Sequence, residues 1–130
     1  MLALSIRQPY AELILRGVKT AELRSKPTHI IGQRFYIYAA KAKARPPVWS
    51  RDLEIASPPG WMIELAEQVK LIRPGDLLPT GLLVGSAVIE RVIAPKRPGD
   101  RFEWVLAAVE RLQTPIKPGG HPQPVWWRVA

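Results

Sequence analysis

The amino-acid sequence predicts an α+β fold that is mainly β. We expect a small barrel of five to six mostly antiparallel strands, with two to three helices inserted between or flanking the early strands. Three observations support this prediction. Short runs rich in β-branched and aromatic residues recur along the chain. The two stretches with the clearest helical spacing of apolar residues both lie within the first 72 positions. The 14 prolines and 9 glycines mostly fall between these runs and mark short turns.

The first 40 residues are typical of a strand, a helix and two further strands. Residues 2–7, LALSIR, alternate apolar with small or polar side chains, which predicts a strand. Pro9 suits the first turn of a helix, and Gly17 suits its end. Residues 21–24, AELR, alternate again and predict a short strand whose polar face carries a carboxylate and a guanidinium. Residues 34–40, RFYIYAA, predict another strand.

The middle of the chain is predicted to be helical. A helix could begin after Pro46 and Pro47, which interrupt a basic segment. A second helix is predicted over residues 61–72, WMIELAEQVKLI, because its apolar residues recur at helical spacing. The residues expected on its apolar side are Met62, Leu65, Ala66, Val69 and Ile72.

The second half of the chain is predicted to consist of strands and turns. Residues 82–93 form a long strand in which Gly85 marks a bulge or a close approach of another segment. Residues 101–113 fit a helix or a strand, and we favour a strand because strands and turns flank them. Residues 114–124, with four prolines and two glycines, predict a loop. Residues 125–129, VWWRV, predict a closing strand.

Length and composition predict one domain over residues 1–130, long enough for a single core. No apolar run is long enough to cross a bilayer, and the first residues lack the plan of a signal peptide, so we expect a cytoplasmic protein with no membrane partner. The chain contains no cysteine, which excludes disulfides, thiolate metal sites and a cysteine nucleophile. The sequence contains no indication of oligomeric state.

The positive charge is concentrated in one part of the chain. The net charge is +8, from 19 basic and 11 acidic residues. The first 51 residues hold ten Lys and Arg against two Glu, whereas the remaining residues hold nine of each sign. A basic concentration of this kind favours a polyanionic partner, usually nucleic acid, over a merely solvated surface.

The sequence lacks the common motifs of cofactor and metal sites. His29 and His121 are the only histidines and lie far apart, so we predict no metal site. There is no G-x-S-x-G nucleophile motif, no phosphate-binding loop and no dinucleotide fingerprint, and we therefore expect no cofactor.

One group of polar residues is expected to gather at a common rim, because a strand–helix–strand path returns the chain beside its start. Cationic side chains there can hold phosphate, and Gln8 can recognise a base edge with its two donors and one acceptor. Glu22, among cations, would stay ionised and orient them, or accept a base amino group. The alternative is an exposed ion pair between Glu22 and Arg24 that contributes little. The predicted nucleic-acid-binding residues are Ser5, Arg7, Gln8, Tyr10, Lys19, Glu22, Arg24, Lys41 and His121.

A second stretch, KPGGHPQPVWW, could offer a stacking surface for bases. Its candidates are His121, Trp126 and Trp127. Tryptophan is more often part of a core, so we expect at least one of the two indoles to be buried for packing.

The sequence resembles the ASCH domain family of the PUA superfamily over nearly its whole length. The resemblance begins in LSIRQPYAELI and continues with the pattern Gly-x-Lys-x-x-Glu-x-Arg, matched by Gly17, Lys19, Glu22 and Arg24. PTGLLVGSAVIERV is similar to the central strand of the family, and FEWVLAAVERLQTPIKPGGHPQPVWW to its closing segment. The resemblance implies a PUA-like β-barrel with a cleft beside it and binding of RNA or another nucleic acid.

Three hypotheses of function remain open. We favour a non-enzymatic module that binds nucleic acid, RNA rather than DNA, and recognises a single-stranded or modified nucleotide in a basic cleft. The alternative is a small ASCH-type hydrolase acting on a modified nucleoside or RNA, with Lys19, Glu22 and Thr20 as its catalytic residues. The third is a protein-interaction module for acidic partners.

The resemblance includes enzymes of two kinds. Amidohydrolases of N4-acetylcytidine use a lysine with a threonine three residues later, whereas here that later position holds Glu22 and Thr20 is adjacent to Lys19. Other members have been proposed as metal-dependent ribonucleases, and this sequence has no evident metal cluster. A lysine beside a carboxylate is a poor general base, which favours binding over catalysis.

Overall fold

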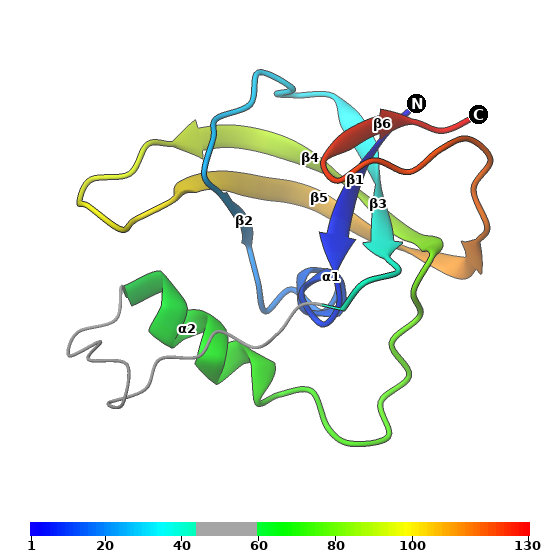
Figure 1. The fold of residues 1–130 in the computed structure, drawn as a ribbon, viewed down its shortest axis with the longest axis horizontal. Helices are drawn as coiled ribbons and strands as arrows, with labels where there is room; N and C mark the ends of the chain where they lie inside the picture. The colour runs from blue at the N-terminus through cyan, green and yellow to red at the C-terminus, as the bar shows by residue number, and fades with distance from the viewer. Residues whose placement is uncertain (44–59) are drawn as a thin grey trace.

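The computed structural model describes residues 1–43 and 60–130, and within these ranges it contains six strands and two helices (Figure 1). The elements in chain order are β1 (Leu2–Arg7), α1 (Tyr10–Leu15), β2 (Ala21–Arg24), β3 (Arg34–Ala40), α2 (Gly60–Val69), β4 (Leu82–Ile93), β5 (Phe102–Ile116) and β6 (Trp126–Arg128).

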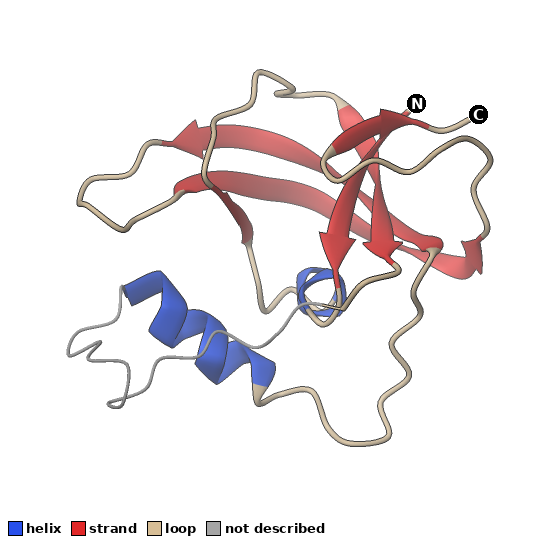
Figure 2. Cartoon of the chain, in the orientation of Figure 1, coloured by secondary structure: helices blue, strands red, loops and turns tan. Residues whose placement is uncertain are grey.

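All six strands belong to one curled sheet that forms a half-barrel, in the order β2-β5-β4-β3-β1-β6. β1 and β3 pair in parallel, and the other neighbouring strands pair antiparallel. The helices lie together at one end of the sheet, with α1 beneath the ends of β1 and β3 and α2 beside α1 (Figure 2). The predicted fold class is confirmed, as is the strand interpretation of residues 101–113.

The core lies inside the curve of the sheet. Alternation along β3 directs Phe35, Ile37 and Ala39 into the main cluster, where α1 adds Ala11 and Ile14. A smaller cluster on the other face of β1 and β3 contains Ala3, Leu83, Tyr38 and Trp127. Since side chains alternate along a strand, Ser5 and Arg7 lie on the same face of β1 as Ala3. This face borders the candidate site.

The long strands β4 and β5 curl through several irregularities in their pairing. One of them lies between Leu83 and Gly85, as expected for a bulge. A Cβ atom at Gly85 would lie 2.5 Å from the carbonyl oxygen of Glu110 and 2.5 Å from Cδ2 of Leu15. The absence of a side chain therefore allows β5 and α1 to approach β4, which confirms the prediction for this glycine.

Three element boundaries differ from the predictions. Residues 114–116 belong to β5 rather than to a loop, because β4 pairs with them: Leu83 lies opposite Ile116. The closing strand is limited to residues 126–128 by its short pairing with β1. The second helix ends at Val69 and continues as a turn through Ile72. The possible helix after Pro46 and Pro47 falls outside the described residues.

The apolar side predicted for residues 61–72 is confirmed. Its five members are all buried or half-buried, and Leu65 is the most deeply buried of them. This side holds α2 beside α1, which places the first turn of α2 at the mouth of the candidate site.

Candidate nucleotide-binding pocket

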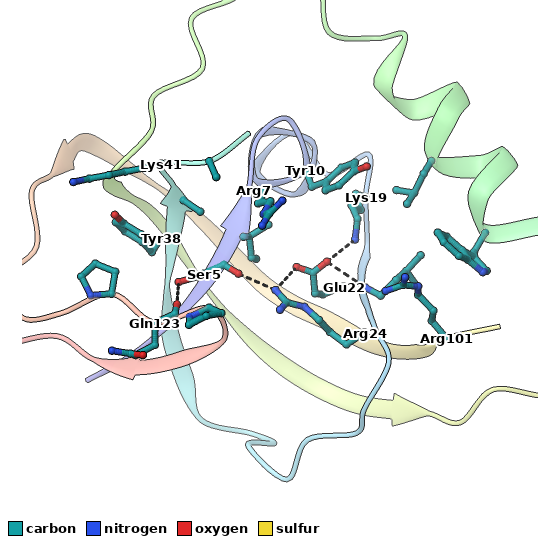
Figure 3. Close-up of a pocket in the computed structure, with 18 of the residues that line it drawn as sticks. Ser5, Arg7, Tyr10, Lys19, Glu22, Arg24, Tyr38, Lys41, Arg101 and Gln123 are labelled. Carbon is teal, nitrogen blue, oxygen red and sulfur yellow. Dashed lines mark hydrogen bonds and ion pairs between the residues drawn. The ribbon is translucent and has the colours of Figure 1, made fainter. Parts of the chain in front are cut away.

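A pocket of about 740 Å³ lies between the end of β1, β2, α2 and the loop that precedes β6 (Figure 3). Its size lies within the range of sites for small organic ligands. Seven of the predicted site residues line it, and they come from four separate segments of the chain. These residues are Ser5, Arg7, Tyr10, Lys19, Glu22, Arg24 and Lys41.

A trio of charged side chains forms the floor of this pocket, in which Lys19 and Glu22 are buried and Arg24 is half-buried. The Nζ atom of Lys19 lies 3.2 Å from Oε1 of Glu22, and Nη2 of Arg24 lies 3.2 Å from Oε2 of the same carboxylate. Lys19 also donates a hydrogen bond to the carbonyl oxygen of Ala21. The backbone N–H of Leu23 donates to Oε1 of Glu22 at 3.2 Å. The polar face of β2 therefore points into the pocket, and Glu22 and Arg24 do not form an exposed ion pair.

Glu22 is held in its ionised form. Burial alone would raise the pKa of its carboxyl, but the charges of Lys19 and Arg24 and their hydrogen bonds outweigh this effect and leave the pKa below its ordinary value. An ionised carboxylate can only accept hydrogen bonds. The floor thus presents a fixed acceptor between two cations.

Arg24 connects β2 to β1, which are not neighbours in the sheet. Its Nη2 atom donates to the carbonyl oxygen of Ser5 at 2.8 Å, in addition to its bond with Glu22. Its guanidinium carbon lies 5.6 Å from the ring centroid of Trp104. These contacts orient the guanidinium at the floor.

Ser5 holds the loop before β6 against the pocket. Its hydroxyl donates to the carbonyl oxygen of Gln123 and accepts a hydrogen bond from Nε1 of Trp127 at 3.0 Å. Both partners are far along the chain, so the hydroxyl fixes one wall of the pocket, which residues 122–124 complete.

Aromatic side chains form the other walls. Tyr38 contributes from β3, and Tyr10 contributes from the start of α1. Burial, followed by the charge of Glu22, raises the pKa of Tyr10, so its phenol is neutral at physiological pH. Trp61 contributes from α2, and its Nε1 donates to the carbonyl oxygen of Gly99 at 2.8 Å. These planar groups give the pocket a partly apolar interior.

Arg101 is a cation at the mouth that the sequence did not identify. Its guanidinium carbon lies 4.8 Å from the ring centroid of Trp61, and both residues line the pocket. Arg101, Arg7 and Lys41 are all exposed. Cations therefore surround the mouth, while the trio containing Glu22 lies at the floor.

Three predicted site residues lie elsewhere. Gln8 is 1 % exposed and does not line the pocket: its Oε1 accepts from the backbone N–H of Glu12 at 3.0 Å, and its Nε2 donates to the carbonyl oxygen of Pro79. Gln8 caps α1, and the prediction that it reaches the cleft was wrong. Thr20 is exposed and His121 is exposed, and neither lines the pocket.

The two tryptophans of β6 pack inside the protein. Trp127 is 5 % exposed and contacts Tyr38 edge-to-face, with ring centroids 5.2 Å apart. Trp126 stacks on Trp104 with ring centroids 6.0 Å apart and also contacts Phe35. The expected burial of at least one indole is confirmed, whereas neither ring provides a stacking wall of the pocket.

A second ionic cluster holds α1 in place behind the pocket. Nη1 and Nη2 of Arg111 donate to Oε1 and Oε2 of Glu12, each at 2.9 Å. Nε of Arg16 donates to Oε2 of Glu12 at 2.7 Å, and Nη2 of Arg16 lies 3.1 Å from the Asp76 carboxylate. The hydrogen bonds from Arg111 are the main reason that the pKa of Glu12 lies below its ordinary value. This clamp fixes α1 to β5.

Within residues 1–43 and 60–130, no three His, Asp or Glu side chains gather to form a metal site. None of the helices in these ranges is long and apolar enough to cross a membrane.

Residues 4–118, which make up most of the chain, match the family model of the ASCH domain. A search of curated proteins finds no match. The half-barrel and the two helices are consistent with the PUA-like fold of this family. The chain therefore belongs to the ASCH domain family.

Proposed function

We propose that this protein is an RNA-binding module that takes one single-stranded or modified nucleotide into the pocket. The observation that supports this most is the division of the pocket between planar apolar walls and cations. Trp61 can contact the face of a base, since base–aromatic stacking tolerates any base, and Tyr38, only 3 % exposed, adds to the pocket wall. The cations at the mouth suit the phosphates on either side of that base.

A single-stranded partner is favoured over a duplex because the polar groups lie inside a pocket. The Glu22 carboxylate and the Lys19 ammonium lie at the floor, and both side chains are nearly inaccessible from outside. A base paired within a helix could not reach them, whereas an unpaired base can turn out of its strand and enter.

A hydrolase is the second candidate, and the buried pairing of Lys19 with Glu22 in the pocket favours it. Two observations count against it. Lys19 donates hydrogen bonds to Ala21 and Glu22, whereas a general base must accept a proton. The Thr20 hydroxyl lies outside the pocket, and the Ser5 hydroxyl is already engaged by Gln123 and Trp127.

Fluorescence anisotropy with a short labelled single-stranded RNA tests the proposal. We expect saturable binding whose affinity falls steeply as salt is raised, because each neutralised phosphate releases counterions. Reversing one charge at the mouth in the variant Arg7→Glu should weaken binding by about tenfold. Arg91→Glu is the matched control, because Arg91 is exposed on β4 and lies outside the pocket.

Competition identifies the alternatives. A duplex of the same sequence and an acidic peptide should each displace the labelled strand poorly. Equal loss of affinity in Arg91→Glu and in the mouth variant would show that only overall charge matters. Tighter binding of the acidic peptide than of RNA would replace the proposal with a protein-interaction role.

A further inference from the structure

The floor of the pocket retains one hydrogen-bond donor and one acceptor after its own bonds are counted. An ammonium has three N–H groups, and Lys19 uses two of them, for Ala21 and for Oε1 of Glu22. Oε1 of Glu22 accepts two bonds, from Lys19 and from the N–H of Leu23. Oε2 accepts one, from Arg24. Among the described residues, a third N–H of Lys19 and a second lone pair on Oε2 are therefore unused.

A ligand that covers this floor must satisfy both groups. The side chains of Lys19 and Glu22 are 4 % and 7 % exposed, so little water remains to solvate them once the pocket is filled. Leaving a hydrogen-bonding position of a buried charged group unfilled is costly. Because the Glu22 carboxylate is ionised, the group that meets it has to be a donor, and the group that meets Lys19 has to be an acceptor.

This requirement determines which end of a nucleotide enters the pocket. A phosphate offers only acceptors, and its negative oxygens would face the Glu22 carboxylate at close range. The hydrogen-bonding edge of a base offers an N–H next to a carbonyl oxygen or an unprotonated ring nitrogen. The cations Arg7, Lys41 and Arg101 lie at the mouth, where the phosphates of an inserted nucleotide would remain.

We infer that the Lys19–Glu22 pair recognises a base edge in which a donor N–H is adjacent to an acceptor, and that the pocket rejects a base whose donor nitrogen carries no hydrogen. This inference rests on the proposed function and specifies the ligand of the same site. A methyl group on the donor nitrogen removes the hydrogen that Oε2 of Glu22 needs and places apolar bulk against the carboxylate.

Two matched pairs of ligands test the inference on the wild-type protein. The first pair is a short single-stranded RNA with one central uridine, and the same RNA with 3-methyluridine in that place. The second pair uses adenosine and N6,N6-dimethyladenosine, so a preference for one base does not prevent the test. Titration calorimetry should show that the methylated member of each bound pair binds at least about tenfold more weakly.

A variant separates direct recognition from a general effect of the methyl group. In Glu22→Gln, the amide oxygen has to face Lys19 and the N–H of Leu23, which turns the amide N–H₂ toward the position of Oε2. The penalty for methylation should then fall to less than about threefold, even if overall affinity also falls. Glu90→Gln is the matched control, because Glu90 is exposed on β4 outside the pocket, and it should retain the full penalty.

The outcomes distinguish the two proposals. If neither unmodified RNA binds, the proposed function itself fails. If the unmodified RNAs bind and their methylated partners bind equally well, the RNA-binding function stands and recognition by the Lys19–Glu22 pair is overturned. An undiminished penalty in a folded Glu22→Gln variant would likewise overturn it.

Discussion

The Lys19 ammonium and the Glu22 carboxylate lie 3.2 Å apart at the floor of the pocket, and neither side chain is more than 7 % exposed. The two residues are three positions apart across the start of β2, and among residues 1–43 and 60–130 only Arg24 gives the carboxylate a further charged partner. A buried ion pair of this kind is sensitive to the loss of one member, because the other then remains as an uncompensated buried charge.

Removing the lysine should therefore affect stability as well as binding. We expect Lys19→Ala to lower the free energy of unfolding by about 3 kcal/mol, near the lower end of values for broken buried pairs, since Arg24 still neutralises Glu22. Urea unfolding followed by circular dichroism measures the change. Lys117→Ala is the control at an exposed lysine and should change stability by less than about 0.5 kcal/mol. An equal effect of both substitutions would contradict the importance of the buried pair.

Stability should fall as the pH is lowered below the ordinary range of glutamate ionisation. The folded-state pKa values of Glu22 and Glu12 both lie below the ordinary value for a glutamate side chain, about 4.5. A lowered pKa means that the folded state favours the charged form, so this stabilisation is complete above about pH 4.5 and is lost as the pH falls through the folded-state pKa values. The difference in unfolding free energy between wild type and Glu12→Gln should therefore shrink as the pH is lowered from about 6 to about 3, a range that includes the ordinary pKa of a glutamate side chain. A constant difference would contradict the assignment.

The clamp between Arg111 and Glu12 predicts a difference between two substitutions of the arginine. Arg111→Ala should destabilise the protein by about 1–3 kcal/mol, because it removes two charge-assisted hydrogen bonds while Arg16 retains its own. Arg111→Lys should restore only part of this, since an ammonium cannot reproduce the paired geometry. Thermal unfolding of wild type and both variants measures the order of their stabilities, with Arg128→Ala as the control at an exposed arginine. Equal stability of the Lys and Ala variants would show that the paired bonds are unimportant.

Gly85 should not tolerate a methyl group. Gly85→Ala places a Cβ 2.5 Å from the Glu110 carbonyl oxygen, and a shift of backbone is needed to relieve the contact. We expect a loss of about 1–3 kcal/mol in unfolding free energy, typical of overpacking. Gly60→Ala is the matched control, because nothing lies within 4 Å of its added Cβ. It should be neutral within about 0.5 kcal/mol.

The wild-type protein should not hydrolyse N4-acetylcytidine. Glu22 occupies the place where that chemistry requires a hydroxyl, and the neighbouring Thr20 lies outside the pocket. Chromatography of the nucleoside after prolonged incubation with the protein measures turnover directly. Hydrolysis that disappears in both Lys19→Arg and Glu22→Gln would overturn this expectation and favour the hydrolase, because arginine cannot serve as a base.

The sequence predicted the part of the site that lies close together along the chain. The short strand carrying Glu22 and Arg24 begins two residues after Lys19, so the alternation of a strand is enough to bring their charges to one surface. The positions of Ser5 and Arg7 at the site could be predicted for the same reason, since β1 is a regular strand. The arrangement of these residues depends on the alternation of side chains along each strand and on the path from β1 through α1 to β2, which brings the chain back beside its start.

The remaining parts of the site depend on tertiary packing. Trp61 and Arg101 reach the mouth because α2 lies beside α1 and because the turn between β4 and β5 lies next to α2. Nothing local distinguishes Trp61 from a core tryptophan, or Arg101 from a solvated arginine in a turn. Gln8 was misassigned because a polar residue at the end of a strand suits a cap as well as a ligand contact. The signal for the capping role was the position of Gln8 four residues before Glu12, because its side-chain oxygen accepts a hydrogen bond from the backbone N–H of Glu12.

The two hydrogen-bonding groups of Ser5 bind residues that are synthesised at different stages of translation. Its carbonyl oxygen receives Arg24, which emerges early from the ribosome, whereas its hydroxyl receives Trp127, which emerges more than a hundred residues later. Because β2 pairs with residues 102–105 of β5, a nascent chain completes the Lys19–Glu22 floor only after β5 has emerged, and it gains the wall made by residues 122–124 later still. We expect a stalled chain that ends before this wall to lack the ability to bind RNA, so that binding begins only after residue 124 has emerged.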